Sequence, residues 1–512
     1  MRPAKPNTGT TFPGLVARRR SMGQAFPLVL GLVLAILGNP ASAASSEDVL
    51  ESAEFIIERY AGWLQNVGIP GVENGVSVYK LTYWTPDVQG GLSLATAAFV
   101  MPMLECEVPL VAFIHGTLYL KADAPSAWNE DAGADLQGYT FGAYGFACVL
   151  PDLLGLGDSP GHHPYLNAAI NARTTLDAIR AAREFQLQLG TPLHQQLFLM
   201  GSSAGAHTAL ATNRMIQEEY PDEFDVAAIG GISGPYAIHP VLRDIMVEEE
   251  PNNGGADLVY MLIGYHATYP GLFASPASFL APPYSTILPP LYNGEYDVVD
   301  IFPLLPAVPA DMFPLALRQQ LLNQPNAPLN QKMRENNVFN WTPQSPMRLC
   351  YCSSDPMVPP ENSLIAYDSL TANGGAPVEL LNLSSNASHA QCGRLGRINI
   401  TAWFRTLKTD CSGTVGIVGP AAAAPDLVVS PNPAATGDIH VHLTGLLAAD
   451  AGEAHIQLLD GQGREVMEQA GPLFRGEMHD ILELEEDLAP GVYSLVVTLP
   501  HGRMVEQLVI TL

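Results

Sequence analysis

The feature that most constrains the fold of this chain is a tight turn that carries a serine between two glycines. The turn reads Gly201-Ser202-Ser203-Ala204-Gly205 and matches the pattern G-x-S-x-G. A short apolar strand is predicted before it, at residues 197–200, and an amphipathic helix directly after it, at 204–219. Small residues let the strand and the helix approach closely, so the hydroxyl of Ser203 is held out above the sheet edge. The motif and its setting predict a serine nucleophile.

Apolar strands alternate with amphipathic helices from about residue 46 to residue 419, which predicts an α/β fold with a doubly wound, mostly parallel sheet. The predicted strands are 109–114, 145–150, 197–200, 227–232, 347–352 and 378–383, and the predicted helices are 166–189 and 204–219.

Changes of composition divide the chain. Arginines, an apolar run and small residues indicate a signal peptide at 1–44, ahead of a catalytic domain at 45–418. Residues 237–346 contain sixteen prolines, which cannot extend a parallel sheet, so an inserted cap is predicted there. A linker at 419–425 leads to 426–512, where apolar residues alternate and turn signals predict a small all-β sandwich.

Charge and cysteine content exclude several functions. The chain has 51 acidic and 24 basic residues and a net charge of −27, which argues against binding to nucleic acid. The six cysteines include Cys350 and Cys352, but no second pair at metal-ligand spacing accompanies them, so a zinc site is not expected. Nucleophilic catalysis by a serine also needs no cofactor, and none is expected. No later apolar run is long enough to span a membrane in the mature chain.

A serine nucleophile needs a base that is itself held by a carboxylate. Asp355 follows the predicted strand 347–352, and His389 follows the apolar run 378–383. Both loops would lie at the carboxyl ends of parallel strands, where they can converge on Ser203. The chain order of serine, aspartate and histidine is that of α/β-hydrolases.

Two backbone N–H groups are needed to hold an oxyanion. Ala204, next after the nucleophile, is predicted to supply one, and Thr117, with Gly116 as the second choice, the other. His115 lies beside this loop and is interpreted as structural because it precedes the serine. The acidic residues at 152 and 158 also precede it and are interpreted as turn residues.

The segments 145–157 and 163–166, which read GFACVLPDLLGLG and HPYL, resemble the secretory-lipase branch of the α/β-hydrolases, the fungal lipase-A type and its bacterial relatives. The resemblance extends over about residues 50–410. It implies hydrolysis of a small-molecule or lipid ester, a lid inserted at the predicted cap, and Ser203, Asp355 and His389 as the catalytic residues. Ser202 and Ala204 depart from residues often found in lipases.

The C-terminal segment resembles the sorting domain of type IX secretion in Bacteroidota-type bacteria. The resemblance is carried by Ser430-Pro431-Asn432-Pro433-Ala434, by Leu459-Asp460-Gly461-Gln462-Gly463-Arg464 and by Leu488-Ala489-Pro490-Gly491-Val492-Tyr493. It implies a secreted or cell-surface protein whose C-terminal domain is handled by the outer-membrane secretion machinery.

Two other functions stay open at this point. A serine peptidase of the same fold would use the same residues, and a non-catalytic surface adhesin would keep only the fold. A disulfide from Cys350 or Cys352 to Cys392 is a further hypothesis, because these cysteines lie close in sequence to Asp355 and His389.

Overall fold

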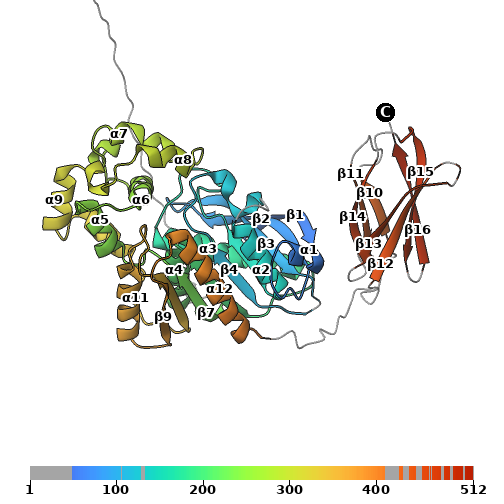
Figure 1. Ribbon diagram of the computed structural model, residues 1–512, viewed down its shortest axis with the longest axis horizontal. Helices are drawn as coiled ribbons and strands as arrows, with labels where there is room; N and C mark the ends of the chain where they lie inside the picture. Colours follow the sequence, from blue (N-terminus) through green and yellow to red (C-terminus); the bar gives the residue numbers. More distant parts are fainter. Residues whose placement is uncertain are drawn as a thin grey trace, which may run out of the picture. The chain divides into compact units, whose positions relative to one another are not determined.

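A nine-stranded sheet organises the larger part of the protein in the computed structural model (Figure 1). The structure describes residues 49–104, 106–128 and 133–409, and, in the C-terminal part, 426–430, 438–444, 452–460, 462, 464–473, 478–484, 488–499 and 502–510. The predicted signal peptide at 1–44 and linker at 419–425 lie outside the described residues.

The sheet has the strand order β1-β2-β3-β5-β4-β6-β7-β8-β9. Its strands are β1 Leu50–Arg59, β2 Val76–Pro86, β3 Leu92–Pro102, β4 Leu110–Ile114, β5 Ala147–Pro151, β6 Gln196–Ser202, β7 Asp225–Ile232, β8 Met347–Cys352 and β9 Val378–Ser384. From β5 to β9 along this order all neighbours are parallel. Each predicted strand is present, with its ends within two residues of the prediction.

Three antiparallel strands, β1, β2 and β3, extend the sheet on the side of β5 and were not predicted from the sequence. In β2 the residues alternate over much of its length between buried and half-buried positions. This period of two is the signal that could have identified the strand.

Helices cover both faces of the sheet, as an α/β fold requires. One core cluster joins the sheet to α3 Ala168–Gln188, α4 Ala204–Glu219 and α11 Glu361–Ala372. The other joins it to α1 Ala61–Asn66, α2 Gly133–Ala143 and α12 His389–Leu407. Both helices predicted from the sequence, α3 and α4, are present, and α4 has the predicted bounds.

The segment between β7 and β8, where the cap was predicted, contains helices and no strand in the described structure. Its α-helices are α5 Arg243–Val247, α6 Gly255–Thr268, α7 Tyr284–Ile287, α8 Val298–Ile301, α9 Leu315–Asn323 and α10 Pro328–Glu335, linked by short 3-10 and π turns. They enclose a hydrophobic cluster of their own, to which Tyr165, Leu166 and Ala204 of the sheet domain contribute. In Figure 1 these helices gather beyond one end of the strands.

The C-terminal part is a sandwich of two antiparallel sheets, as predicted. One sheet has the order β10-β11-β14 and the other β13-β12-β15-β16. The strands are β10 Asp426–Ser430, β11 Asp438–Thr444, β12 Gly452–Leu459, β13 Glu465–Leu473, β14 Met478–Glu483, β15 Gly491–Leu499 and β16 Gly502–Ile510. The predicted turns at 460–463 and 500–502 join paired strands, and a shared apolar core lies between the sheets.

No helix in the described residues combines the length and the apolar character that a membrane span requires.

Candidate active site

Ser203 occupies a strained turn between the end of β6 and the start of α4. Its backbone has φ 55° and ψ −125°, which a residue with a side chain rarely adopts. A Cβ at Gly201 would collide with the carbonyl group of Gly205, and a Cβ at Gly205 would collide with the carbonyl oxygen of Ile114. Glycine at both positions is therefore what lets strand and helix meet at this sharp turn.

His389 begins α12, and a capping box fixes the point at which this helix starts. The Ser388 hydroxyl accepts a hydrogen bond from the backbone N–H of Gln391, and the Gln391 side chain accepts one from the Ser388 N–H. The imidazole Nε2 of His389 lies 3.0 Å from Oγ of Ser203. The helix start thus places the histidine within hydrogen-bonding reach of the serine.

Asp355 holds the other side of the His389 ring. Its Oδ2 lies 2.7 Å from Nδ1 of His389, and its Oδ1 accepts hydrogen bonds from the backbone N–H groups of Met357 and Val358. Burial by itself would raise the pKa of Asp355, but His389 and these two amides outweigh it and hold the pKa below the usual value. Asp355 is therefore an ionised acceptor.

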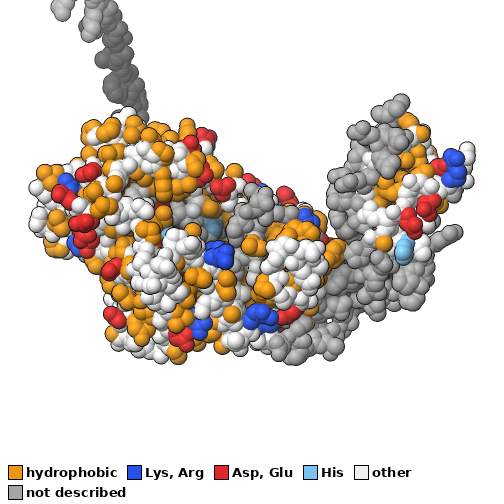
Figure 2. All heavy atoms as spheres, viewed as in Figure 1, with side chains coloured by type: hydrophobic (Ala, Val, Ile, Leu, Met, Phe, Trp, Pro, Cys, Tyr) orange, Lys and Arg blue, Asp and Glu red, His pale blue; other side chains and the backbone are white. Residues whose placement is uncertain are grey.

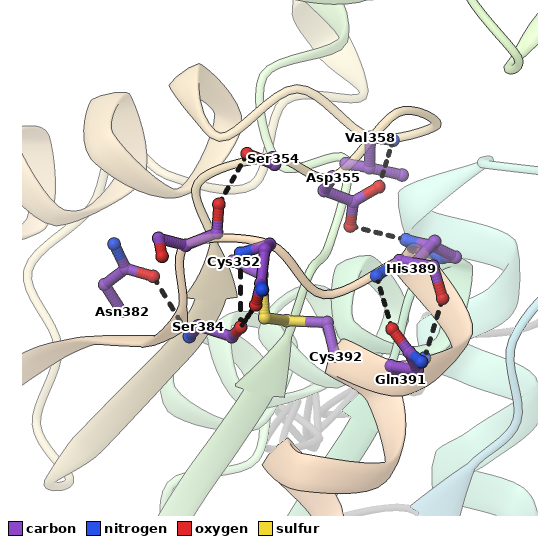
Figure 3. Close-up of a disulfide and its surroundings, with 12 residues drawn as sticks. Cys352, Ser354, Asp355, Val358, Asn382, Ser384, His389, Gln391 and Cys392 are labelled. Carbon is purple, nitrogen blue, oxygen red and sulfur yellow. Dashed lines mark hydrogen bonds and ion pairs between the residues drawn. A yellow bond between two sulfur atoms is a disulfide. The ribbon is translucent and has the colours of Figure 1, made fainter.

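A disulfide joins the loop of the carboxylate to the helix of the imidazole (Figure 3). Cys352, the last residue of β8, is bonded to Cys392 in the first turn of α12. Cys352 lies three residues before Asp355, and Cys392 lies three residues after His389. The disulfide hypothesis is confirmed for Cys352, whereas Cys350 is a free, buried thiol whose pKa burial raises to about 12.

The residues predicted for the oxyanion hole lie around the same serine. The backbone N–H groups of Ala204 and Thr117 donate no hydrogen bond within the described part of the chain. A Cβ at Gly116 would lie 3.5 Å from Cβ of Ser203, so the Gly116 backbone passes close to the serine. Both Gly116 and Thr117 line a cavity that Ser203 also lines.

The rival residues make other contacts. Both ring nitrogens of His115 face backbone carbonyl oxygens, of Gly116 at 2.6 Å and of Asp152 at 3.0 Å. The buried carboxylate of Asp152 accepts hydrogen bonds from Thr96 and from the N–H of Ser126, and burial raises its pKa to about 6. Asp158 pairs with Lys80. These bonds support the structural interpretation given to all three from the sequence.

Two cavities meet at Ser203 and differ in size and in the number of charged side chains that line them. The smaller, of about 20 Å³, is lined mainly by apolar side chains, among them Leu242, Ile245 and Leu258. The larger, of about 480 Å³, contains His389 and several charged side chains. Its lining includes Val298 and Phe302 of the cap, next to a region around α7 and α8 where hydrophobic side chains gather at the surface (Figure 2).

A carboxylate of the cap, Asp257 in the first turn of α6, lines both cavities and was not predicted. Its Oδ1 accepts a hydrogen bond of 2.7 Å from the Tyr119 hydroxyl, and the Thr117 and Tyr165 hydroxyls lie 2.6 Å apart beside it. Burial raises the pKa of Asp257, although the Tyr119 hydrogen bond and the charge of His389 oppose the shift. No helix was predicted at this position, and an acidic residue in the first turn of a helix also suits the helix dipole, so the sequence did not single out Asp257.

The sheet, the strained serine turn and the linked hydroxyl, imidazole and carboxylate together define an α/β-hydrolase. The model of the alpha/beta hydrolase family matches residues 111–390. The chain belongs to this family.

Solved structures with the same fold include an esterase and a lipase. The rice cell wall degrading esterase LipA from Xanthomonas oryzae is 28% identical with a TM-score of 0.64, and the match covers 70% of this chain and 97% of LipA. Candida antarctica lipase A is similar in fold, with 15% identity and a TM-score of 0.56, over 74% of this chain and 88% of the lipase. No curated protein sequence matches the chain significantly.

Proposed function

We propose that this protein is a secreted serine hydrolase that cleaves carboxylic esters, with Ser203 as nucleophile, His389 as general base and acid, and Asp355 as the carboxylate that orients His389. The observation that carries the proposal is the pair of contacts on the two sides of one imidazole ring. Nε2 lies 3.0 Å from the serine oxygen, and Nδ1 lies 2.7 Å from the carboxylate.

The reaction follows from these positions. Ser203 Oγ attacks the ester carbonyl carbon while His389 Nε2 takes the hydroxyl proton. The N–H groups of Ala204 and Thr117 hold the oxyanion, aided by the positive end of α4. His389 then gives its proton to the leaving alcohol, and water repeats the sequence on the acyl-enzyme. Asp355 keeps the imidazole in the tautomer that can accept at Nε2 and stabilises the imidazolium.

Two observations favour an ester over a peptide substrate. The 28% identical LipA is described as an esterase, and the match covers almost its whole length. The smaller cavity at Ser203 is lined mainly by apolar side chains, which suit the hydrocarbon chain of an acyl group. The resemblance to the secretory lipases, the fungal lipase-A type among them, points the same way.

The experiment is the Ser203→Ala variant, assayed on nitrophenyl esters and on dipeptide anilides. We expect ester turnover to fall by about four orders of magnitude, the range seen when a member of such a triad is removed. Ser353→Ala, which alters an exposed serine in the loop after β8, is the matched control and should keep full turnover. Wild-type turnover by a folded Ser203→Ala variant would remove Ser203 from the mechanism, and faster cleavage of anilides than of esters would favour a peptidase.

Export is proposed on separate grounds. The predicted signal peptide and the resemblance of the C-terminal sandwich to a type IX sorting domain support a secreted or surface-attached location. Fractionation of cultures before and after deletion of residues 426–512 tests this: retention in the cell after the deletion supports it, and unchanged export contradicts it.

A further inference from the structure

The larger cavity contains a guanidinium group that has no partner among the residues the structure describes. Arg397 of α12 is half-buried and lines this cavity together with Ser203 and His389. It makes no hydrogen bond and no ion pair with any described residue. Other half-buried arginines of the same domain do: Arg180 pairs with two carboxylates, and Arg348 pairs with one. A charge that is partly removed from water without a counter-ion is costly to keep, so such a position needs an explanation.

None of the described charges around Arg397 forms an ion pair with this cation. Burial lowers the pKa of Arg397, and the like charge of Arg394 lowers it further. Three carboxylates also line the cavity, and none of them is bonded to the guanidinium. Asp257 accepts its bond from Tyr119, and the Asp297 side chain caps α8. Asp123 is exposed on the loop after β4.

The position of Arg397 on α12 places its side chain near the alcohol part of a bound ester. His389, Gly393 and Arg397 follow each other at intervals of four residues on α12, and therefore share a helix face. A Cβ at Gly393 would lie 3.6 Å from Nη1 of Arg397, so the guanidinium reaches back to Gly393, which lies one helical turn, ~6 Å along the helix axis, from His389. The leaving oxygen must lie beside Nε2 of His389, which protonates it. The alcohol part of an ester therefore extends into the cavity that Arg397 lines.

The acyl part has a separate place. The smaller cavity reaches Ser203 but is not lined by His389, and most of its lining is apolar. Its volume of about 20 Å³ is a small fraction of the volume of the larger cavity, about 480 Å³. We therefore assign a short acyl chain to the smaller cavity and the alcohol to the larger one, which contains Arg397.

We propose that Arg397 is a specificity-determining residue that binds a carboxylate carried by the alcohol part of the substrate. The planar guanidinium can bind a carboxylate through two parallel hydrogen bonds, and a partly desolvated site strengthens them. The preferred substrates are then hydroxy acids whose hydroxyl group carries a short acyl chain and whose carboxylate is free. This inference rests on the proposed esterase function and names its substrate class.

The test compares two acetates that differ in one group, 4-carboxyphenyl acetate and 4-carbamoylphenyl acetate. We expect the ratio of kcat/KM for the carboxylate to kcat/KM for the amide to fall about tenfold to hundredfold in Arg397→Gln, the range of a lost charge-assisted contact. Arg397→Lys should keep part of the ratio, because the charge remains without the planar fork. Arg405→Gln removes an exposed charge about two turns further along the same helix, where it pairs with Glu73, and should leave the ratio unchanged.

A binding measurement on a catalytically inactive variant tests the role of Arg397 separately from the proposed esterase function. Calorimetry of 4-hydroxybenzoate with Ser203→Ala should detect binding, and the added Arg397→Gln substitution should abolish it. An unchanged substrate ratio in Arg397→Gln, or equal binding by the single and the double variant, would overturn the role of Arg397. If wild-type protein hydrolyses neither acetate while binding still depends on Arg397, the esterase function fails and the anion site stands.

Discussion

Two carboxylates approach the serine from different regions of the molecule, and their surroundings give them opposite properties. Asp355 comes from the sheet edge, where His389 and two backbone amides donate to it, and its pKa lies below the usual value. Asp257 comes from the cap, where tyrosine side chains surround it, and burial raises its pKa. At Asp355 the charge of His389 and two backbone amides outweigh the effect of burial on the pKa, whereas at Asp257 burial outweighs the hydroxyl donors that oppose it.

The largest effect is expected at the sheet edge, from Asp355→Asn. The amide cannot accept the Nδ1 proton of His389 as a carboxylate does, so the imidazole loses its working tautomer. We expect kcat to fall by about four orders of magnitude. Ester turnover by the purified variant, with wild-type circular dichroism as the control for folding, measures the loss. A decrease of less than tenfold would mean that Asp355 does not orient the base.

The effect of Asp355→Asn on thermal stability should also depend on pH. The folded pKa of Asp355 is depressed, so its ionised form stabilises the fold above the unfolded pKa of about 4, and this contribution is lost as pH falls through the folded value. The Tm of wild type should therefore exceed that of Asp355→Asn at pH 7, and the two values should converge below pH ~4.

A smaller effect is expected from the disulfide that joins the two loops of the sheet edge. Cys352 and Cys392 are separated by 40 residues, and replacing both by serine frees this loop in the unfolded chain. We expect the free energy of unfolding to fall by about 2–4 kcal/mol, with a decrease in turnover because Asp355 and His389 are no longer tied together. Urea denaturation gives the first quantity. Cys350→Ala, in the same strand, removes a free thiol and should lose about 1 kcal/mol with turnover retained. Equal losses of unfolding free energy and of turnover in both variants would show that the disulfide does not stabilise the two loops.

The two regions also differed in what the sequence could predict. The strand bounds, the serine turn and the loops of Asp355 and His389 follow from apolar periodicity and chain order, because a parallel sheet brings the carboxyl ends of its strands to one edge. The cap has short helices broken by prolines, so no periodicity tells which of its residues faces the serine. Asp257 was missed for this reason.

Arg397 illustrates a different limit. The intervals of four from His389 to Gly393 and Arg397 are visible in the sequence, but they mean a shared face only once a helix is known to begin at Ser388 or His389. The Ser388 and Gln391 capping box was the available signal for that start. Whether a described carboxylate pairs with Arg397 depends on the packing of segments that are distant in the sequence, so the local sequence could not predict that none does.

The smallest effect, opposite in sign, is expected in the cap from Asp257→Asn. Because the folded pKa of Asp257 is raised, ionising this group costs folding free energy at any pH above the unfolded pKa of about 4. Asparagine keeps an oxygen that can accept from Tyr119 and has no charge to desolvate. We expect the variant to be more stable than wild type at pH 7 by up to about 1 kcal/mol, with the difference vanishing as pH falls below ~4. Thermal unfolding of both proteins across pH 3–8 measures it. A variant less stable than wild type at pH 7 would show that the ionised carboxylate is satisfied in the cap, and the contrast with Asp355 would disappear.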